Sequence, residues 1–167
     1  LDRDNNVSFR SGLPIKDAGY KFHMNDIASA IGLCNYPYIE QNIEIQRQNA
    51  AVYYQELSGM KSVRLLENDP RNKSSCWLFT ILANRRNELI EFLKENHIES
   101  SPVHARNDKH AALIKYKKQK LPIMDEISDK MLCVPVGWWL NMHQVRDIAK
   151  LIKEFYLEEH CVHNPRK

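Results

Sequence analysis

Several signals that assign a protein to a class at once are missing from this sequence of 167 residues. No apolar run approaches the ~18–20 residues that span a bilayer, so we expect no membrane segment. The net charge is only +3, which gives no reason to expect nucleic acid as a partner. Glycine-rich phosphate loops, the nucleophile elbow and the paired-histidine zinc motif are also absent. Function must therefore be sought in dispersed residues.

The cysteines give no sign of a metal site. Cys34, Cys76, Cys133 and Cys161 form no CxxC pair, the arrangement from which structural zinc sites usually draw ligands. No secretory signal precedes them, so we expect a reducing, cytoplasmic compartment and not a disulfide framework. Because Cys34 and Cys133 lie in apolar stretches, we expect both to be buried.

What is present suits one globular domain. Hydrophobic residues make up 43% of the chain and charged residues 27%, which is ordinary for a folded protein. The first residue is Leu1, with no initiator methionine, so we expect either a processed terminus or the later part of a longer protein. A lysine-rich run over 115–120 indicates either a solvated surface or a site that attracts anions. It is the one feature of the sequence that supports nucleic acid binding.

Hydrophobic periodicity predicts two helices near the start. Asn25 is suited to cap a helix whose apolar residues over 27–34 recur at helical spacing. Pro37 must end or kink that helix, because it has no N–H to donate. A longer helix is expected over 38–58, with Gly59 as its stop.

Strands and helices alternate along the rest of the chain. We expect strands over 62–66, 76–82, 98–103 and 131–136, helices over 87–96, 122–130 and 142–157, a polar loop over 104–110 and a frayed tail over 158–167. This order predicts an α/β chain whose small domain is of the α+β type, with a small sheet covered by helices after one long helix.

Three clusters could carry chemistry. The stretch 19–26 places Lys21 and His23 before a helix N-terminus, where a phosphate or carboxylate can bind, although a simple capped helix also explains it. In the loop 104–110, Arg106 could grip a diphosphate, and a hydrophilic surface loop is the alternative.

The third cluster is the pair Trp138 and Trp139. Adjacent indoles after a strand could form a stacking wall for a base or a sugar ring. Core or interface packing is the alternative.

Together these stretches resemble the sugar-nucleotide aminotransferases of the DegT/DnrJ/EryC1/StrS family. The segment 19–33 is similar to a motif of that family, and Arg47, Tyr53 and Leu57 fit its interdomain helix. Further similarity lies at 75–79, 96–99, 104–110, 121–122 and 134–139. The resemblance spans roughly residues 1–157 and is closest to perosamine and viosamine synthases.

The resemblance implies the carboxy-terminal portion of a pyridoxal-phosphate transferase of the aspartate-aminotransferase fold, fold type I. Residues 1–36 would end the large cofactor-binding domain, 37–59 would form the interdomain helix, 60–157 the small domain and 158–167 the tail. The Schiff-base lysine would then lie upstream, so we expect no catalytic residue in this chain and no activity of the chain alone.

The resemblance also implies roles for particular residues. Lys21 and His23 would lie near the pyridoxal phosphate of the neighbouring subunit in a homodimer. The implied substrate contacts are His104, Arg106, Asn107 and His110. The implied reaction moves an amino group from glutamate to a 4-keto-6-deoxy nucleoside-diphosphate sugar.

Trp77 stands where many relatives have histidine, so no role is transferred to it. The alternative function is a non-catalytic binding module, or a split-gene half that pairs with a separate amino-terminal domain.

Overall fold

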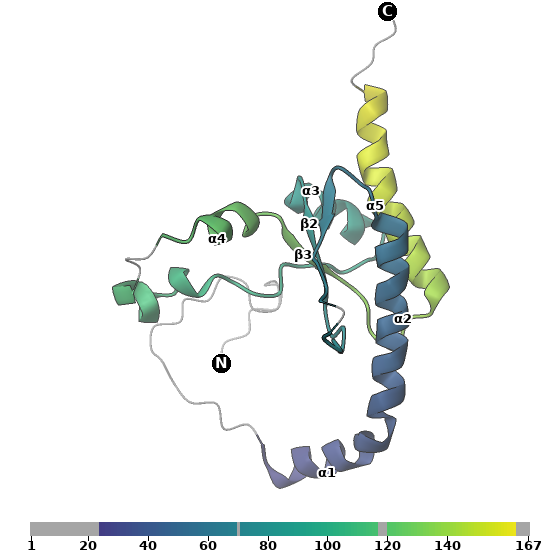
Figure 1. Ribbon diagram of the computed structural model, residues 1–167, viewed down its shortest axis with the longest axis vertical. Helices are drawn as coiled ribbons and strands as arrows, with labels where there is room; N and C mark the ends of the chain where they lie inside the picture. The colour runs from purple at the N-terminus through teal and green to yellow at the C-terminus, as the bar shows by residue number, and fades with distance from the viewer. Residues whose placement is uncertain (1–23, 70, 117–119, 163–167) are drawn as a thin grey trace, which may run out of the picture.

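The computed structural model describes residues 24–69, 71–116 and 120–162, with helices arranged around a small sheet (Figure 1). In chain order the elements are α1 Asp26–Asn35, η1 Tyr36–Tyr38, α2 Ile39–Leu57, β1 Val63–Leu65, β2 Phe79–Ala83, α3 Arg86–Glu95, η2 Asn107–Lys109, η3 Ala111–Tyr116, α4 Pro122–Ile127, β3 Met131–Val134 and α5 Met142–Val162. The predicted mixture of helices and strands is confirmed.

The sheet has three antiparallel strands in the order β1-β2-β3. Val63 of β1 pairs with Ala83 of β2, and Phe79 at the other end of β2 pairs with Val134 of β3. Four of the five β2 residues are buried, as expected of a central strand that is covered by other elements. The sheet is therefore the centre from which the surrounding loops are positioned.

Helices α2 and α5 cover the sheet and pack against each other on the right of Figure 1. Tyr53 of α2 stacks on Phe79 of β2 with ring centroids 4.7 Å apart. Lys153 of α5 donates to Glu56 of α2 at 2.6 Å, and this contact lowers the pKa of the Glu56 carboxyl. The long second helix predicted from the sequence thus contacts both β2 and α5.

The predicted boundaries of the first two helices are confirmed. The Asn25 side chain accepts a hydrogen bond from the Ala28 N–H at 2.9 Å, which caps α1. Pro37 lies in the short η1 turn between α1 and α2. Gly59 follows α2 with a φ of 78°, a left-handed conformation that glycine adopts at little cost.

Helix α1 extends away from the sheet and leaves its apolar residues uncovered (Figure 1). Ile27 is 75% exposed and Leu33 is 74% exposed. Cys34 is exposed as well, so the expectation that it is buried is wrong, whereas Cys133 is buried as predicted. Helical periodicity identified this apolar face, but nothing in the described part of the chain covers it.

Three other boundaries differ from the prediction. The strand expected over 76–82 begins only at Phe79, because Cys76 takes a left-handed φ of 51° that interrupts the extended backbone. The strand expected over 98–103 is wrong, since only Ser101 bridges to Cys133. Helix α5 continues to Val162 into the stretch predicted to fray.

Within residues 24–69, 71–116 and 120–162, we find no helix with both the length and the apolar character needed to cross a bilayer.

Candidate functional site

A pocket of about 760 Å³ lies between the loop 102–109 and helix α4. In Figure 1 these segments extend to the left of the sheet, on the opposite side from α2 and α5. His104, Arg106 and Asn107 line the pocket from the loop, and Met124 and Asp125 line it from α4. Its volume falls within the ~300–1,000 Å³ typical of small-molecule sites. Three of the four predicted substrate residues are therefore brought together.

Arg106 holds the loop against α4. Its Nε and Nη2 donate to the two carboxylate oxygens of Asp108, each at 2.8 Å, and Nη1 donates to Asp125 Oδ1 at 2.6 Å. The side chain is only 13% exposed, and these hydrogen bonds raise the pKa of Arg106 and lower that of Asp108. The sequence predicted that Arg106 grips a diphosphate, but one edge of its guanidinium already binds the Asp108 carboxylate. Arg106 thus shapes the pocket wall.

The charges that line the pocket balance one another. The basic lining residues are Arg86, Arg106 and Lys109, and the acidic ones are Asp108, Asp125 and Asp129. Such a lining has no excess positive charge with which to attract an anion. The hydrogen-bonding groups of His104 and Asn107 remain. The described lining is therefore suited to an uncharged part of a ligand.

His104 is presented by a strained turn. Val103 has a φ of 54°, which is rare for a β-branched residue, and the His104 N–H donates to the Pro102 carbonyl at 2.5 Å across it. The His104 ring lies 6.4 Å from the ring of Trp77 between centroids. Trp77, to which the sequence assigned no role, therefore lies beside His104, although it is not among the residues that line the pocket.

The remaining predicted site residues lie elsewhere. His110 is half-buried at the end of η2 and does not line the pocket as the described residues define it. Lys21 and His23, predicted to contact the cofactor, lie outside the described residues.

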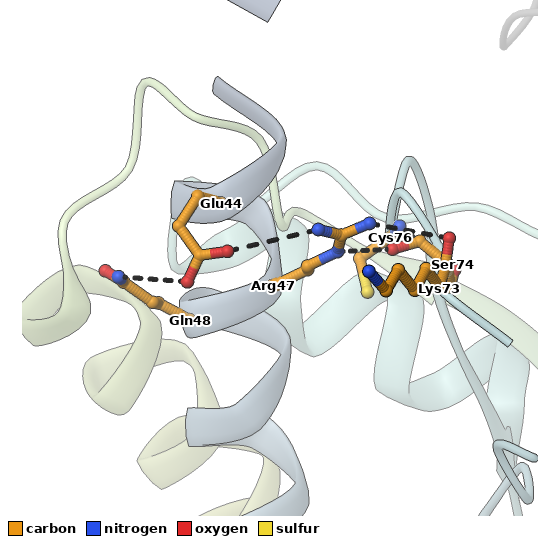
Figure 2. A network of polar contacts seen from close by, with 6 residues as sticks. All are labelled: Glu44, Arg47, Gln48, Lys73, Ser74 and Cys76. Carbon is orange, nitrogen blue, oxygen red and sulfur yellow. Dashed lines mark hydrogen bonds and ion pairs between the residues drawn. The ribbon is translucent and has the colours of Figure 1, made fainter. Parts of the chain in front are cut away.

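Arg47 joins α2 to the segment that leads into β2 (Figure 2). Its Nε donates to the Ser74 carbonyl at 2.8 Å and its Nη2 to the Lys73 carbonyl at 3.4 Å. The Ser74 hydroxyl in turn accepts from the Cys76 N–H at 3.1 Å. Glu44, one turn earlier on α2, lies 4.0 Å from Nη1. Helix α2 thereby positions the segment that carries Trp77.

Trp138 and Trp139 lie on the surface, with exposed fractions of 51% and 66%. Their rings meet edge to face with centroids 5.9 Å apart. The buried Asn49 side chain donates to the carbonyls of Gly137 and Leu140 at 3.2 and 3.1 Å, which fixes the loop beneath them. Core packing is therefore wrong for the two indoles, whereas a stacking wall and an interface both stay open.

Comparison with known proteins decides the family. Residues 3–153 match the model of the DegT/DnrJ/EryC1/StrS aminotransferase family. The chain belongs to this family. The resemblance inferred from the sequence is thus confirmed over most of its length, and the helices and sheet described above represent the fold-type-I class.

Curated relatives of this chain are more than twice its length. The chain is 27% identical over 161 residues to dTDP-4-amino-4,6-dideoxy-D-glucose transaminase of Escherichia coli, covering 91% of this chain and 43% of that protein. It is 28% identical to GDP-perosamine synthase of Escherichia coli O157:H7, covering 84% of this chain and 39% of that protein. The chain therefore spans about two fifths of the length of these relatives.

A solved structure of a sugar aminotransferase has a similar fold. Sugar aminotransferase CalS13 from Micromonospora echinospora superposes with a TM-score of 0.74 at 31% identity, covering 81% of this chain and 37% of that one. Members of the DegT/DnrJ/EryC1/StrS family are pyridoxal-phosphate-dependent aminotransferases that act on nucleotide sugars.

The described pocket does not fit the cofactor's phosphate. A phosphate requires unpaired cationic or N–H donors, whereas Arg106 already pairs with two carboxylates and the charged lining is balanced.

Proposed function

We propose that this chain supplies the small domain of an aminotransferase that moves an amino group from glutamate to a 4-keto-6-deoxy nucleoside-diphosphate sugar. The observation that carries the proposal is the family match over residues 3–153 together with a pocket lined by His104, Arg106 and Asn107. These three side chains come from the loop for which the resemblance implied substrate contact.

Each of the three residues has a distinct role in this proposal. His104 and Asn107 offer hydrogen-bonding groups to sugar hydroxyls or to a base. Arg106 holds the loop in place through Asp108 and Asp125, because an occupied guanidinium orients its neighbours more readily than it binds a new anion. His110, which does not line the described pocket, would contact substrate only from outside it.

The cofactor and the second subunit belong to the same proposal. Pyridoxal phosphate would be held outside the described pocket, with Lys21 and His23 donating to it across a homodimer. Glutamate as the amino donor and a cytoplasmic location remain predictions from the sequence.

A chimaera tests the proposed function. Residues 24–157 would replace the corresponding part of the Escherichia coli dTDP-4-amino-4,6-dideoxy-D-glucose transaminase, and formation of 2-oxoglutarate from glutamate would be measured with a nucleotide 4-keto sugar. We expect turnover by the chimaera and none by the 167-residue chain alone. A chimaera that folds, binds the cofactor and transfers no amino group contradicts the proposal.

One observation favours the alternative of a non-catalytic partner module. The apolar side chains of Ile27, Ile31 and Leu33 on α1 are more than half exposed. Large apolar side chains exposed together on one element often mark an interaction surface. If the chain binds a separate amino-terminal domain tightly and the complex shows no transamination, this alternative holds and the aminotransferase proposal is wrong.

A further inference from the structure

Trp77 is turned outward just before a buried strand. It is 63% exposed, whereas its neighbours Cys76 and Leu78 are partly buried and Phe79, two positions later, is almost fully buried. The aromatic and β-branched run 76–82 predicted a buried strand that would include Trp77. An outward indole at the start of such a run needs a cause in the structure.

That cause is a backbone held in strained conformations. Cys76, directly before Trp77, has a φ of 51°, and Val103, directly before His104, has a φ of 54°. Non-glycine residues in this region carry strain, which the surrounding structure must maintain and which tends to gather at functional sites. Cys76 and Val103 therefore place the rings of Trp77 and His104 next to each other.

The segment before Trp77 is also fixed from α2. Arg47 donates to the carbonyls of Lys73 and Ser74, and Ser74 accepts from the Cys76 N–H (Figure 2). Figure 2 shows these contacts converging on the chain just before Trp77. The indole position is thus set by a side chain of the interdomain helix.

The two rings do not close against each other. The planes of Trp77 and His104 are tilted by 57° with centroids 6.4 Å apart, so they do not form a parallel stack. His104 lines the pocket, whose charged residues are balanced. A flat, uncharged group is the ligand that such a pair accommodates, because aromatic faces stack on it without needing a counter-charge.

We propose that Trp77, with His104 beside it, is the stacking surface for the nucleobase of the nucleotide sugar. This inference rests on the proposed function and adds which part of the substrate this edge of the pocket takes. Arg47 acts as a positioning residue, since it acts on Trp77 only through the segment 73–76. The diphosphate would lie outside the charge-balanced lining.

Calorimetric titration of the 167-residue chain tests the inference. The probes are dTDP, UDP and GDP, with pyrophosphate and glucose 1-phosphate as ligands that lack a base. We expect the nucleoside diphosphates to bind more tightly than either base-free ligand. Trp77→Ala should weaken their binding by about tenfold or more, the effect of losing one base–aromatic stack, and Trp77→Phe should weaken it less.

Trp138→Ala is the matched control, because it removes another exposed indole and should leave binding unchanged. Arg47→Met should weaken nucleoside diphosphate binding while the chain stays folded by circular dichroism, and Arg47→Lys should restore part of the affinity. Equal binding by Trp77→Ala and the unaltered chain overturns the inference, as does equal binding of glucose 1-phosphate and dTDP. Neither result decides the proposed function, because the chimaera assay tests amino transfer separately.

Discussion

The Nη1 atom of Arg106 lies 2.6 Å from Oδ1 of Asp125, joining the loop of His104 and Asn107 to α4 across 19 positions of sequence. The Nε and Nη2 atoms of the same guanidinium donate to the carboxylate of Asp108. An ion-pair network therefore holds the loop side of the pocket against α4.

Removing one side of this network should loosen the loop without unfolding the domain. Asp125→Asn keeps the Arg106–Asp108 pair and removes the Asp125 charge that pairs with Arg106, so we expect nucleotide-sugar binding to weaken by about two- to fivefold, the range of a partly solvated ion pair. Binding is measured by calorimetry. Glu126→Gln is the control, since Glu126 lies on the same helix and pairs only loosely with Arg64 at 4.0 Å. Equal affinities of the two variants would show that the network does not shape the pocket.

Acid should release the same loop. The hydrogen bonds from Arg106 lower the pKa of Asp108, so the folded chain binds a proton there less readily than the unfolded chain. The resulting stabilisation is complete above the ordinary aspartate pKa of about 3.9 and is lost as the pH falls through the lower folded value. The protection of the amides over 105–109 against hydrogen exchange, taken relative to the intrinsic exchange rate at each pH, should fall below about pH 4. If Asp108→Asn loses protection to the same extent in acid, the titrating group is another one.

The sequence predicted the parts of the fold that local chemistry decides. The Asn25 cap, the break at Pro37 and the stop at Gly59 follow from side-chain or backbone properties of single residues. The loop with His104 and Asn107 was identified by its resemblance to a family.

Other features depend on contacts between distant residues and had no sequence signal. Left-handed backbone at Cys76 and Val103 is rare for these residue types, so no propensity indicates it. The engagement of Arg106 by Asp125 arises from tertiary packing. The exposure of Cys34 could not be foreseen, because periodicity identifies an apolar face without showing whether anything covers it.

Asn49 should be essential for the loop that carries the tryptophan pair. It is 1% exposed and its Nδ2 donates to the Gly137 and Leu140 carbonyls. Asn49→Ala removes a donor from the Leu140 carbonyl and leaves the Gly137 carbonyl with the Leu140 N–H alone, so we expect the free energy of unfolding in urea to fall by about 1–3 kcal/mol. Gln48→Ala, one position earlier on α2 and exposed at its contact with Glu44, should change it by less than about 0.5 kcal/mol. Similar losses in both variants would contradict this role.

Gly137 should control the position of Trp139. A Cβ on Gly137 would lie 2.2 Å from the indole of Trp139, so Gly137→Ala must displace that ring. Because the ring is 66% exposed, it can swing into solvent, and we expect a stability loss below about 1 kcal/mol with a clear change in tryptophan fluorescence. Gly32→Ala, where an added Cβ meets nothing within 4 Å, should leave the fluorescence unchanged. An unaltered spectrum for Gly137→Ala would show that the ring does not rest there.

Nuclear magnetic resonance can locate the proposed nucleotide-sugar site between the loop 102–109 and α4. Amide and indole signals of the ¹⁵N-labelled chain would be followed while dTDP-glucose is added. We expect saturable shifts at His104, Asn107 and Asp125 and at the indole of Trp77. Saturable shifts confined to the indoles of Trp138 and Trp139, or no shifts at all, would show that the nucleotide sugar does not bind in this pocket.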